Sequence, residues 1–134
     1  MTNKLKRSVA QMVASARERI KQVPAAELLN MFNQPEVQIV DIRDIRERQR
    51  DGYIPDSFHC PRGMAEFWVD PDSPYYKDIF AEDKTFIFYC ASGWRSALTV
   101  DTLRKMGMEN IAHLEHGFGS WKKVNGTIEF SAKK

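Results

Sequence analysis

Cysteine is scarce in this sequence. Only two of the 134 residues are cysteines, Cys60 and Cys90, and they stand thirty positions apart without a Cys-x-x-Cys pair. This usage does not favour a disulfide scaffold, and it makes the cytoplasm, a reducing compartment, the expected location. The three histidines, His59, His113 and His116, form no zinc-ligand spacing with either cysteine. We therefore expect neither a metal nor an organic cofactor.

Long apolar runs and a large net charge are also missing. No apolar stretch approaches the length that a membrane-spanning helix needs. The apolar residues near the N-terminus are interrupted by charges, which a secretory signal peptide would not show. The formal net charge is only +2, too small to argue for a nucleic-acid partner. We therefore expect no membrane and no nucleic acid among the partners.

The remaining composition is that of a soluble domain. With 43% hydrophobic and 28% charged residues, the 134-residue chain is long enough for one substantial core. It contains no internal repeat and no low-complexity tract. We therefore expect a single domain, over residues 22–130, preceded by a separate segment.

That segment, residues 1–21, is predicted to be an amphipathic helix. Its basic residues gather on one side, and Glu18 is the first acidic residue. The pattern resembles a mitochondrial transit peptide, but no cleavage-type linker follows. We favour a helix that packs its apolar face on the domain or on a second copy, which would make a homodimer. The apolar residues at helical spacing are Leu5, Val9, Met12, Val13, Ala16 and Ile20.

Strand and helix patterns alternate along the rest of the chain. Apolar runs predict strands at 37–41, 57–60, 84–90 and 110–115, and the run 84–90 has the continuous apolar pattern of a central parallel strand. Helical patterns fall at 24–32, 44–52, 61–68, 94–106 and 117–126. Such alternation predicts an α/β fold in three layers, with a mostly parallel central sheet flanked by helices.

Cys90 stands at the carboxyl end of the predicted central strand, where ligands bind in folds of this kind. Backbone amides that follow it, in the loop and the first helical turn, have no intrahelical acceptor and can converge on an anion. Ala91 and Ser92 are small, and Gly93 permits backbone conformations that most residues resist. Arg95 adds a permanent positive charge.

A strand cysteine is often only a small buried hydrophobe. Here the succession small-Ser-Gly-x-Arg-Ser at a helix start favours a reactive thiolate instead, because the helix terminus and the guanidinium both stabilise its charge.

Three stretches of this sequence resemble the rhodanese-like sulfurtransferase family, in its single-domain form, over roughly residues 22–126. "IVDIRDIRERQRDGYIPDSFHCP" is similar to the family's strand ending in Asp-x-Arg, followed by a glutamate and Gly-His-Ile-Pro-Gly-Ala. "CASGWRS" resembles the active-site loop, in which four residues separate Cys from Arg. "HLEHGFGSW" resembles the terminal strand and helix with Gly-Gly and Trp. The resemblance implies a rhodanese-like three-layer fold.

The resemblance also implies an activity. A small-molecule donor such as thiosulfate would pass sulfane sulfur to Cys90, which would hold it as a persulfide and hand it to a thiol or cyanide acceptor. The amides of residues 91–95 would cradle the persulfide, and Arg95 would stabilise both the thiolate and the departing sulfite.

Four further residues belong to this expected site. Trp94 forms a wall at its rim or simply packs, and Ser96 either hydrogen-bonds the sulfur or caps the helix. Asp41 and Arg43 would brace the loop from behind, the alternative being an ordinary surface salt bridge.

Some residues depart from the family pattern or stay open. His116 stands where the family has glycine, and it either borders the pocket or is solvated. Cys60 is structural or a resolving partner for Cys90, and Arg62 lies near the entrance or merely on the surface.

Two other functional classes compete. A phosphatase or arsenate reductase on the same scaffold would use a longer loop, with five residues between Cys and Arg. A non-catalytic binding module is the second, although inactive relatives commonly lack the cysteine that is present here.

Overall fold

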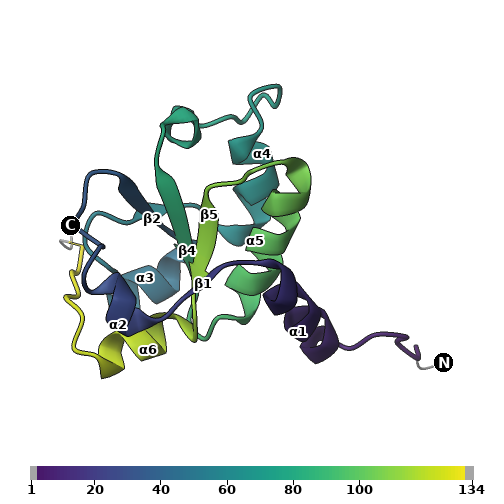
Figure 1. The fold of residues 1–134 in the computed structure, drawn as a ribbon, viewed down its shortest axis with the longest axis horizontal. Helices are drawn as coiled ribbons and strands as arrows, with labels where there is room; N and C mark the ends of the chain where they lie inside the picture. The colour runs from purple at the N-terminus through teal and green to yellow at the C-terminus, as the bar shows by residue number, and fades with distance from the viewer. Residues whose placement is uncertain (1–2, 132–134) are drawn as a thin grey trace.

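The computed structural model describes residues 3–131, which form an α/β fold around one parallel sheet (Figure 1). The strand order is β1-β5-β4-β2-β3, so β4 lies at the centre. All four neighbouring pairs of strands are parallel. The strands are β1 (Gln22–Val23), β2 (Val37–Asp41), β3 (Phe58–His59), β4 (Thr85–Tyr89) and β5 (Ile111–Leu114).

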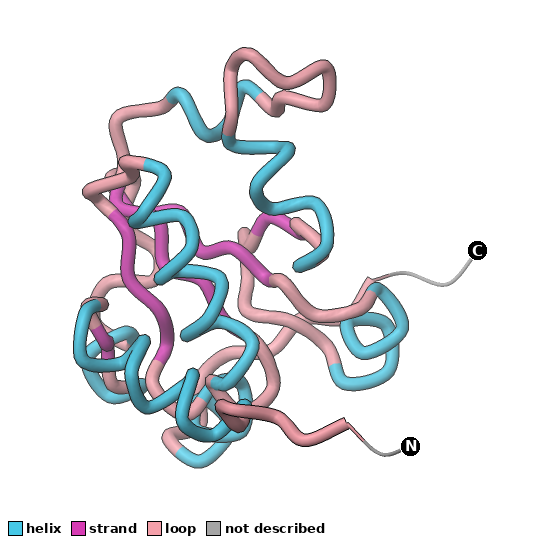
Figure 2. Tube along the Cα trace, turned by 90° about the vertical axis from the view of Figure 1, so that its right-hand side faces the viewer, coloured by secondary structure: helices cyan, strands magenta, loops and turns pink. Residues whose placement is uncertain are grey.

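Helices connect these strands and cover both faces of the sheet. Figure 2 shows the strands running through the interior, with helical segments around them. The α-helices are α1 (Val9–Arg19), α2 (Ala25–Leu28), α3 (Ile45–Asp51), α4 (Ala65–Val69), α5 (Trp94–Met106) and α6 (Gly117–Lys123), and two 3₁₀ turns, η1 (Arg62–Met64) and η2 (Asp78–Ala81), lie in the connection between β3 and β4.

The two faces of β4 supply two separate core clusters. Successive side chains of a strand point to opposite faces. Ile87 and Tyr89 therefore pack on one side, with residues of α2 and α6. Phe86 and Phe88 pack on the other, with residues of α5 and α4. Burial on both faces is why this strand reads as an unbroken apolar run, and the predicted central position of 84–90 is confirmed.

The predicted fold class is thus confirmed, as are several element ends. Gly52, whose φ is +81°, caps the C-terminus of α3, and Gly107, whose φ is +115°, caps that of α5. A side chain rarely adopts such φ values, so glycine is suited to stop a helix there.

The N-terminal helix is shorter than predicted. α1 begins only at Val9, because Ser8 and Gln11 form a reciprocal capping box, with the Ser8 hydroxyl accepting from the Gln11 amide at 3.1 Å. It ends at Arg19, since the next residue is already extended and leads into β1. Leu5 therefore lies outside the helix and is 82% exposed. The first two residues of the prediction lie outside the described range.

Two other local predictions need correction. The helix expected at 24–32 is regular only over Ala25–Leu28, and turns continue from there toward β2. The sequence also predicted no strand at Gln22–Val23, which pairs in parallel with β5. Two residues are too few to show a periodic pattern, so only the pairing defines this strand.

α1 packs on the domain itself (Figure 1). Val13 and Ala16 are buried against Ala97 of α5, with Ile20 and Leu98 at the edges of this cluster. Val9 and Met12 remain partly exposed on the same helix. Within residues 3–131 no helix is both long and apolar enough to cross a membrane.

Candidate active site

Cys90 follows the last residue of β4, and the loop after it leads directly into α5. Gly93 caps α5 in the left-handed conformation, with φ +94°. The N-terminus of α6 lies behind the loop: the Phe118 amide donates to the carbonyl oxygen of Cys90 at 2.8 Å, and the Gly119 amide donates to that of Ala91 at 3.2 Å. The carbonyl oxygens of Cys90 and Ala91 therefore accept hydrogen bonds from α6 and do not face the sulfur.

Backbone amides donate to the sulfur of Cys90. The Gly93 amide lies 3.1 Å from Sγ and the Ser96 amide 3.4 Å from it. The Ser96 hydroxyl oxygen, 3.5 Å away, accepts from the thiol. The thiol is free, and Cys90 is only 1% exposed. Donors aimed at a sulfur in this way stabilise negative charge on it, whether on a thiolate or on a persulfide.

A close backbone contact requires glycine at position 117. Its φ is +66°, and a Cβ atom there would lie 2.6 Å from both the Cys90 carbonyl oxygen and the Ala91 carbonyl carbon. Any side chain would push the loop away from α6 or distort it. Gly117, the first glycine of the "HGFGSW" stretch, is thus required for the observed packing of α6 against the Cys90 loop.

Ser96 belongs to a buried hydrogen-bond chain that the sequence did not reveal. Its hydroxyl lies 2.8 Å from Nδ1 of His113, and Nε2 of His113 lies 3.1 Å from Oε1 of Gln22. With the Gln22 oxygen accepting from Nε2, the imidazole is neutral and Nδ1 accepts the Ser96 hydroxyl. Ser96 therefore does not cap α5. The available signal was a histidine between the apolar residues of the predicted strand 110–115.

Burial lowers the pKa of His113 from its ordinary 6.5 to about 4, and the charges of Arg17 and His116 act in the same direction. An unfolded chain binds this proton near pH 6.5, whereas the folded protein does not. The stability that the neutral imidazole contributes is therefore complete above pH 6.5 and is lost as the pH falls toward 4, by about 3 kcal/mol in total.

We expect His113→Gln to remove this part of the acid sensitivity. Urea unfolding at pH 7 and pH 4.5 would show a smaller loss of unfolding free energy in the variant than in the native protein. His116→Gln is the control, because that side chain is 68% exposed and its charge is the smallest of the three causes of the lowered His113 pKa, so its replacement should change the pH dependence much less. An equal pH dependence in all three proteins would contradict the buried neutral state of His113.

Arg95 is directed at Glu47 of α3. Its guanidinium donates to the two carboxylate oxygens at 2.8 and 3.0 Å. The hydrogen bond from Arg95 lowers the pKa of Glu47. From the sequence, the positive charge of Arg95 was expected to stabilise the thiolate and the departing sulfite. In the structure this charge is also paired with Glu47, which the sequence indicated only as the glutamate after Asp-x-Arg.

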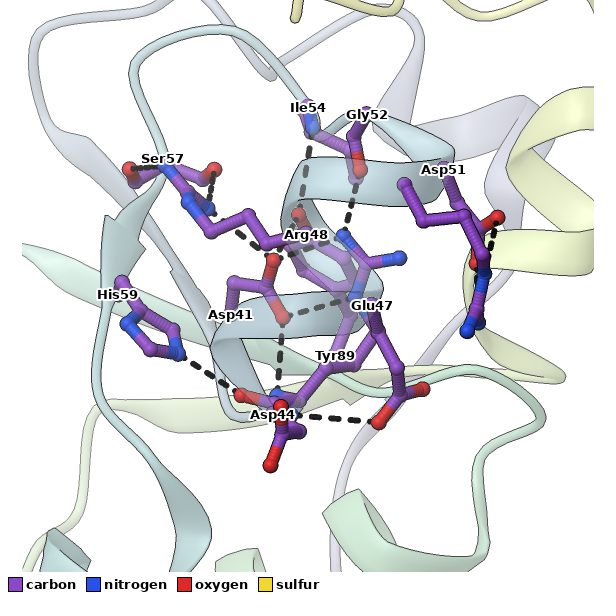
Figure 3. A network of polar contacts seen from close by, with 12 residues as sticks. Asp41, Asp44, Glu47, Arg48, Asp51, Gly52, Ile54, Ser57, His59 and Tyr89 are labelled. Carbon is purple, nitrogen blue, oxygen red and sulfur yellow. Dashed lines mark hydrogen bonds and ion pairs between the residues drawn. The ribbon is translucent and has the colours of Figure 1, made fainter. Parts of the chain in front are cut away.

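Asp41 lies at the centre of a buried polar network (Figure 3). Arg43 donates to both of its oxygens at 3.0 and 2.8 Å. Arg48 and the Tyr89 hydroxyl donate to Oδ2 at 3.0 and 2.9 Å. Burial alone would raise the pKa of Asp41, but the hydrogen bonds and charge of Arg43 outweigh it and the net pKa is lowered.

This network lies directly beneath the loop. Tyr89 directly precedes Cys90 in the chain. The Arg43 guanidinium stacks over the ring of Phe118, 4.4 Å from its centroid, and the backbone amide of Phe118 donates to the Cys90 carbonyl oxygen. Asp41 and Arg43 are 0% and 1% exposed. They therefore form a buried ion pair, and the alternative that the sequence left open, an ordinary surface salt bridge, is wrong.

The other residues considered in the sequence are spread around the loop. Trp94 is 43% exposed at the first position of α5, and Arg62 is exposed on η1. Burial raises the pKa of the Cys60 thiol to about 12, so Cys60 stays protonated in the core. The backbone of His116 lies close to the loop: its nitrogen would be 3.1 Å from a Cβ atom placed on Gly93. The side chain of His116 is mostly exposed.

Nowhere in residues 3–131 do three His, Cys, Asp or Glu side chains gather as a metal site would require.

Comparison with known proteins identifies the family. The rhodanese-like domain matches residues 24–124. A thiosulfate sulfurtransferase/rhodanese-like domain-containing protein of Mus musculus is 25% identical over 119 residues, which are 85% of this chain and 73% of that protein. A rhodanese-related protein from Thermoplasma volcanium has 26% identity and a TM-score of 0.67, over 83% of this chain and 99% of its own. This chain belongs to the rhodanese-like domain family.

A further solved structure is much more similar. A protein of unknown function from Rhodopseudomonas palustris, described as a possible tyrosine phosphatase, is 48% identical to this chain. The TM-score is 0.93, over 96% of this chain and 99% of that one. The similarity therefore includes α1 and β1, which lie before the matched rhodanese-like residues.

Proposed function

We propose that this protein is a sulfurtransferase whose nucleophile is Cys90. The thiolate attacks the outer sulfur of a donor such as thiosulfate, the S–S bond of the donor breaks, and sulfite leaves with the bonding electron pair. An acceptor, cyanide or a thiolate, then attacks the outer sulfur of the persulfide, and Cys90 leaves as the thiolate. No metal or organic cofactor takes part in either step.

The observation that carries this proposal is the pair of amide hydrogen bonds to Sγ. Gly93 and Ser96 donate to the sulfur at 3.1 and 3.4 Å, in a loop with four residues between Cys90 and Arg95. We expect a loop of this length to fit around the single outer sulfur of a persulfide. The family membership of the chain and the name of its mouse relative support the same chemistry.

A second candidate function is phosphate-ester hydrolysis, which the description of the Rhodopseudomonas palustris protein favours. Phosphatases on this scaffold use one more residue in the loop, which widens it for a tetrahedral oxyanion. Arg95, the residue that would bind such an oxyanion, is held by Glu47 here. We therefore rank hydrolysis below sulfur transfer.

One experiment distinguishes these functions. We expect the purified protein to form thiocyanate from thiosulfate and cyanide, and to gain the mass of one sulfur atom when it is treated with thiosulfate alone. Cyanide should then remove that mass. Hydrolysis of an aryl phosphate by the same preparation should be undetectable.

Robust phosphatase activity without sulfur loading would replace the proposed function by the second candidate. The absence of both reactions, with several donors, would instead favour a non-catalytic binding module.

A further inference from the structure

Arg17 of α1 lies against the Cys90 loop. It stands one helical turn after Val13, on the face that α1 packs against α5. Its Nη2 atom is 3.7 Å from the position that a Cβ of residue 93 would occupy, and the amide of Gly93 donates to the Cys90 sulfur. The guanidinium thus lies beside the residue whose amide holds the sulfur.

The charge of Arg17 also reaches the polar chain beside the sulfur. It is one of the causes, after burial, of the low pKa of His113. His113 is hydrogen-bonded to Ser96, whose amide and hydroxyl both contact Sγ. The position beside Gly93 places the Arg17 guanidinium near the sulfur, and its effect on His113 agrees with that position.

Arg17 differs from the other arginines that lie against the body of the protein, because it has no partner. Its Nε–H is fully buried and, within residues 3–131, finds no acceptor to which it can donate a hydrogen bond. No carboxylate of the described chain pairs with its guanidinium. The arginines that do pair, at 2.6–3.2 Å from a carboxylate oxygen, are Arg19, Arg43, Arg46, Arg48, Arg50, Arg95 and Arg104.

Holding an unpaired guanidinium partly buried costs free energy, which an anionic ligand would offset. The chemistry of that ligand follows from the guanidinium, whose planar set of donors matches the oxygens of a sulfonate or sulfite group.

We infer that Arg17 binds the anionic oxygens of the sulfur donor at Cys90, the role that the sequence gave to Arg95. The identity of the ligand as a donor such as thiosulfate rests on the proposed function. The anion site itself does not, because it stands on the position and unpaired state of Arg17. Since the rhodanese-like match begins at residue 24, α1 adds this residue to the active site from outside the matched domain.

The test compares two alkylating reagents that differ in charge. Iodoacetate is anionic and iodoacetamide is neutral, and both react with the same thiolate, so the ratio of their rates at Cys90 reports the local attraction for anions. Mass spectrometry assigns the reaction to Cys90. We expect Arg17→Gln to lower this ratio by about three- to tenfold and to raise the inhibition constant of sulfite. Arg7→Gln, the same change at an exposed position before α1, should leave both unchanged.

Arg17→Lys keeps the charge and provides a second measurement in case the glutamine variant unfolds. It should retain most of the rate ratio but bind sulfite less tightly, because an ammonium lacks the paired donors. An unchanged ratio in a folded Arg17→Gln protein would overturn the inference, whether or not sulfur is transferred. A lowered ratio in a protein that transfers no sulfur would support the anion site and refute the proposed function.

Discussion

Replacing Cys90 by serine is expected to abolish thiocyanate formation, with a loss of at least about 10³-fold. The hydroxyl is far less acidic than a thiol, and it cannot form a persulfide. The variant should also gain no sulfur mass after treatment with thiosulfate. The fold should persist, because serine conserves the shape of the side chain and can still accept from the Gly93 and Ser96 amides.

Cys60→Ser is the matched control for this prediction. Cys60 is fully buried in the core cluster that also contains Cys90, and its raised pKa keeps the thiol protonated. We expect its replacement to lower stability but to leave most of the turnover at temperatures where the variant is folded. If Cys60→Ser were inactive and Cys90→Ser still loaded sulfur, the nucleophile would be Cys60.

The second large effect is expected on stability, from Asp41→Asn. The substitution preserves the shape of the side chain but removes its charge, which leaves Arg43 buried without a counter-ion and weakens the contact with Arg48. Breaking a buried pair by removing one partner costs about 3–5 kcal/mol. Urea unfolding at pH 7 measures this loss as a lower midpoint.

Asp44→Asn controls for the chemical change itself. Asp44 is the N-cap of α3, its side chain is 47% exposed, and its ion-pair partner Arg46 is 84% exposed. Asparagine is as good an N-cap as aspartate, and exposed ion pairs contribute little, so the expected change in unfolding free energy is much smaller than that of Asp41→Asn. Equal unfolding free energies for the two variants would mean that Asp41 does not compensate the charge of Arg43.

Activity provides an additional measurement on Asp41→Asn. Tyr89 donates to Asp41 and directly precedes Cys90, so a looser network would disturb the loop amides. We therefore expect reduced turnover even where the variant is fully folded, and no such reduction in Asp44→Asn.

Much of the fold could be predicted from the sequence because it depends on local patterns. The unbroken apolar run 86–90, within the predicted strand 84–90, identified the central strand, since only burial on both faces tolerates it. The glycines at 52 and 107 indicated helix ends because their left-handed conformation is strained for other residues. The position of Cys90 at the carboxyl end of that strand followed from the same local reasoning.

The partners of the loop residues could not be predicted in this way. Ser96 meets His113 across 17 positions, Arg95 meets Glu47 across 48, and Arg17 reaches Gly93 from the N-terminal helix. No spacing or periodicity in a single sequence records which side chains face each other across packed elements.

By itself, therefore, the sequence determined the α/β class, the central strand, and a cysteine followed by small residues at a helix start, because each depends on neighbouring residues. Only the tertiary structure decided that Arg95 pairs with Glu47 while Arg17 stays unpaired beside the loop. That choice depends on how α1, α3 and α5 pack around the end of the sheet, and packing of this kind is set by contacts between residues far apart in the chain.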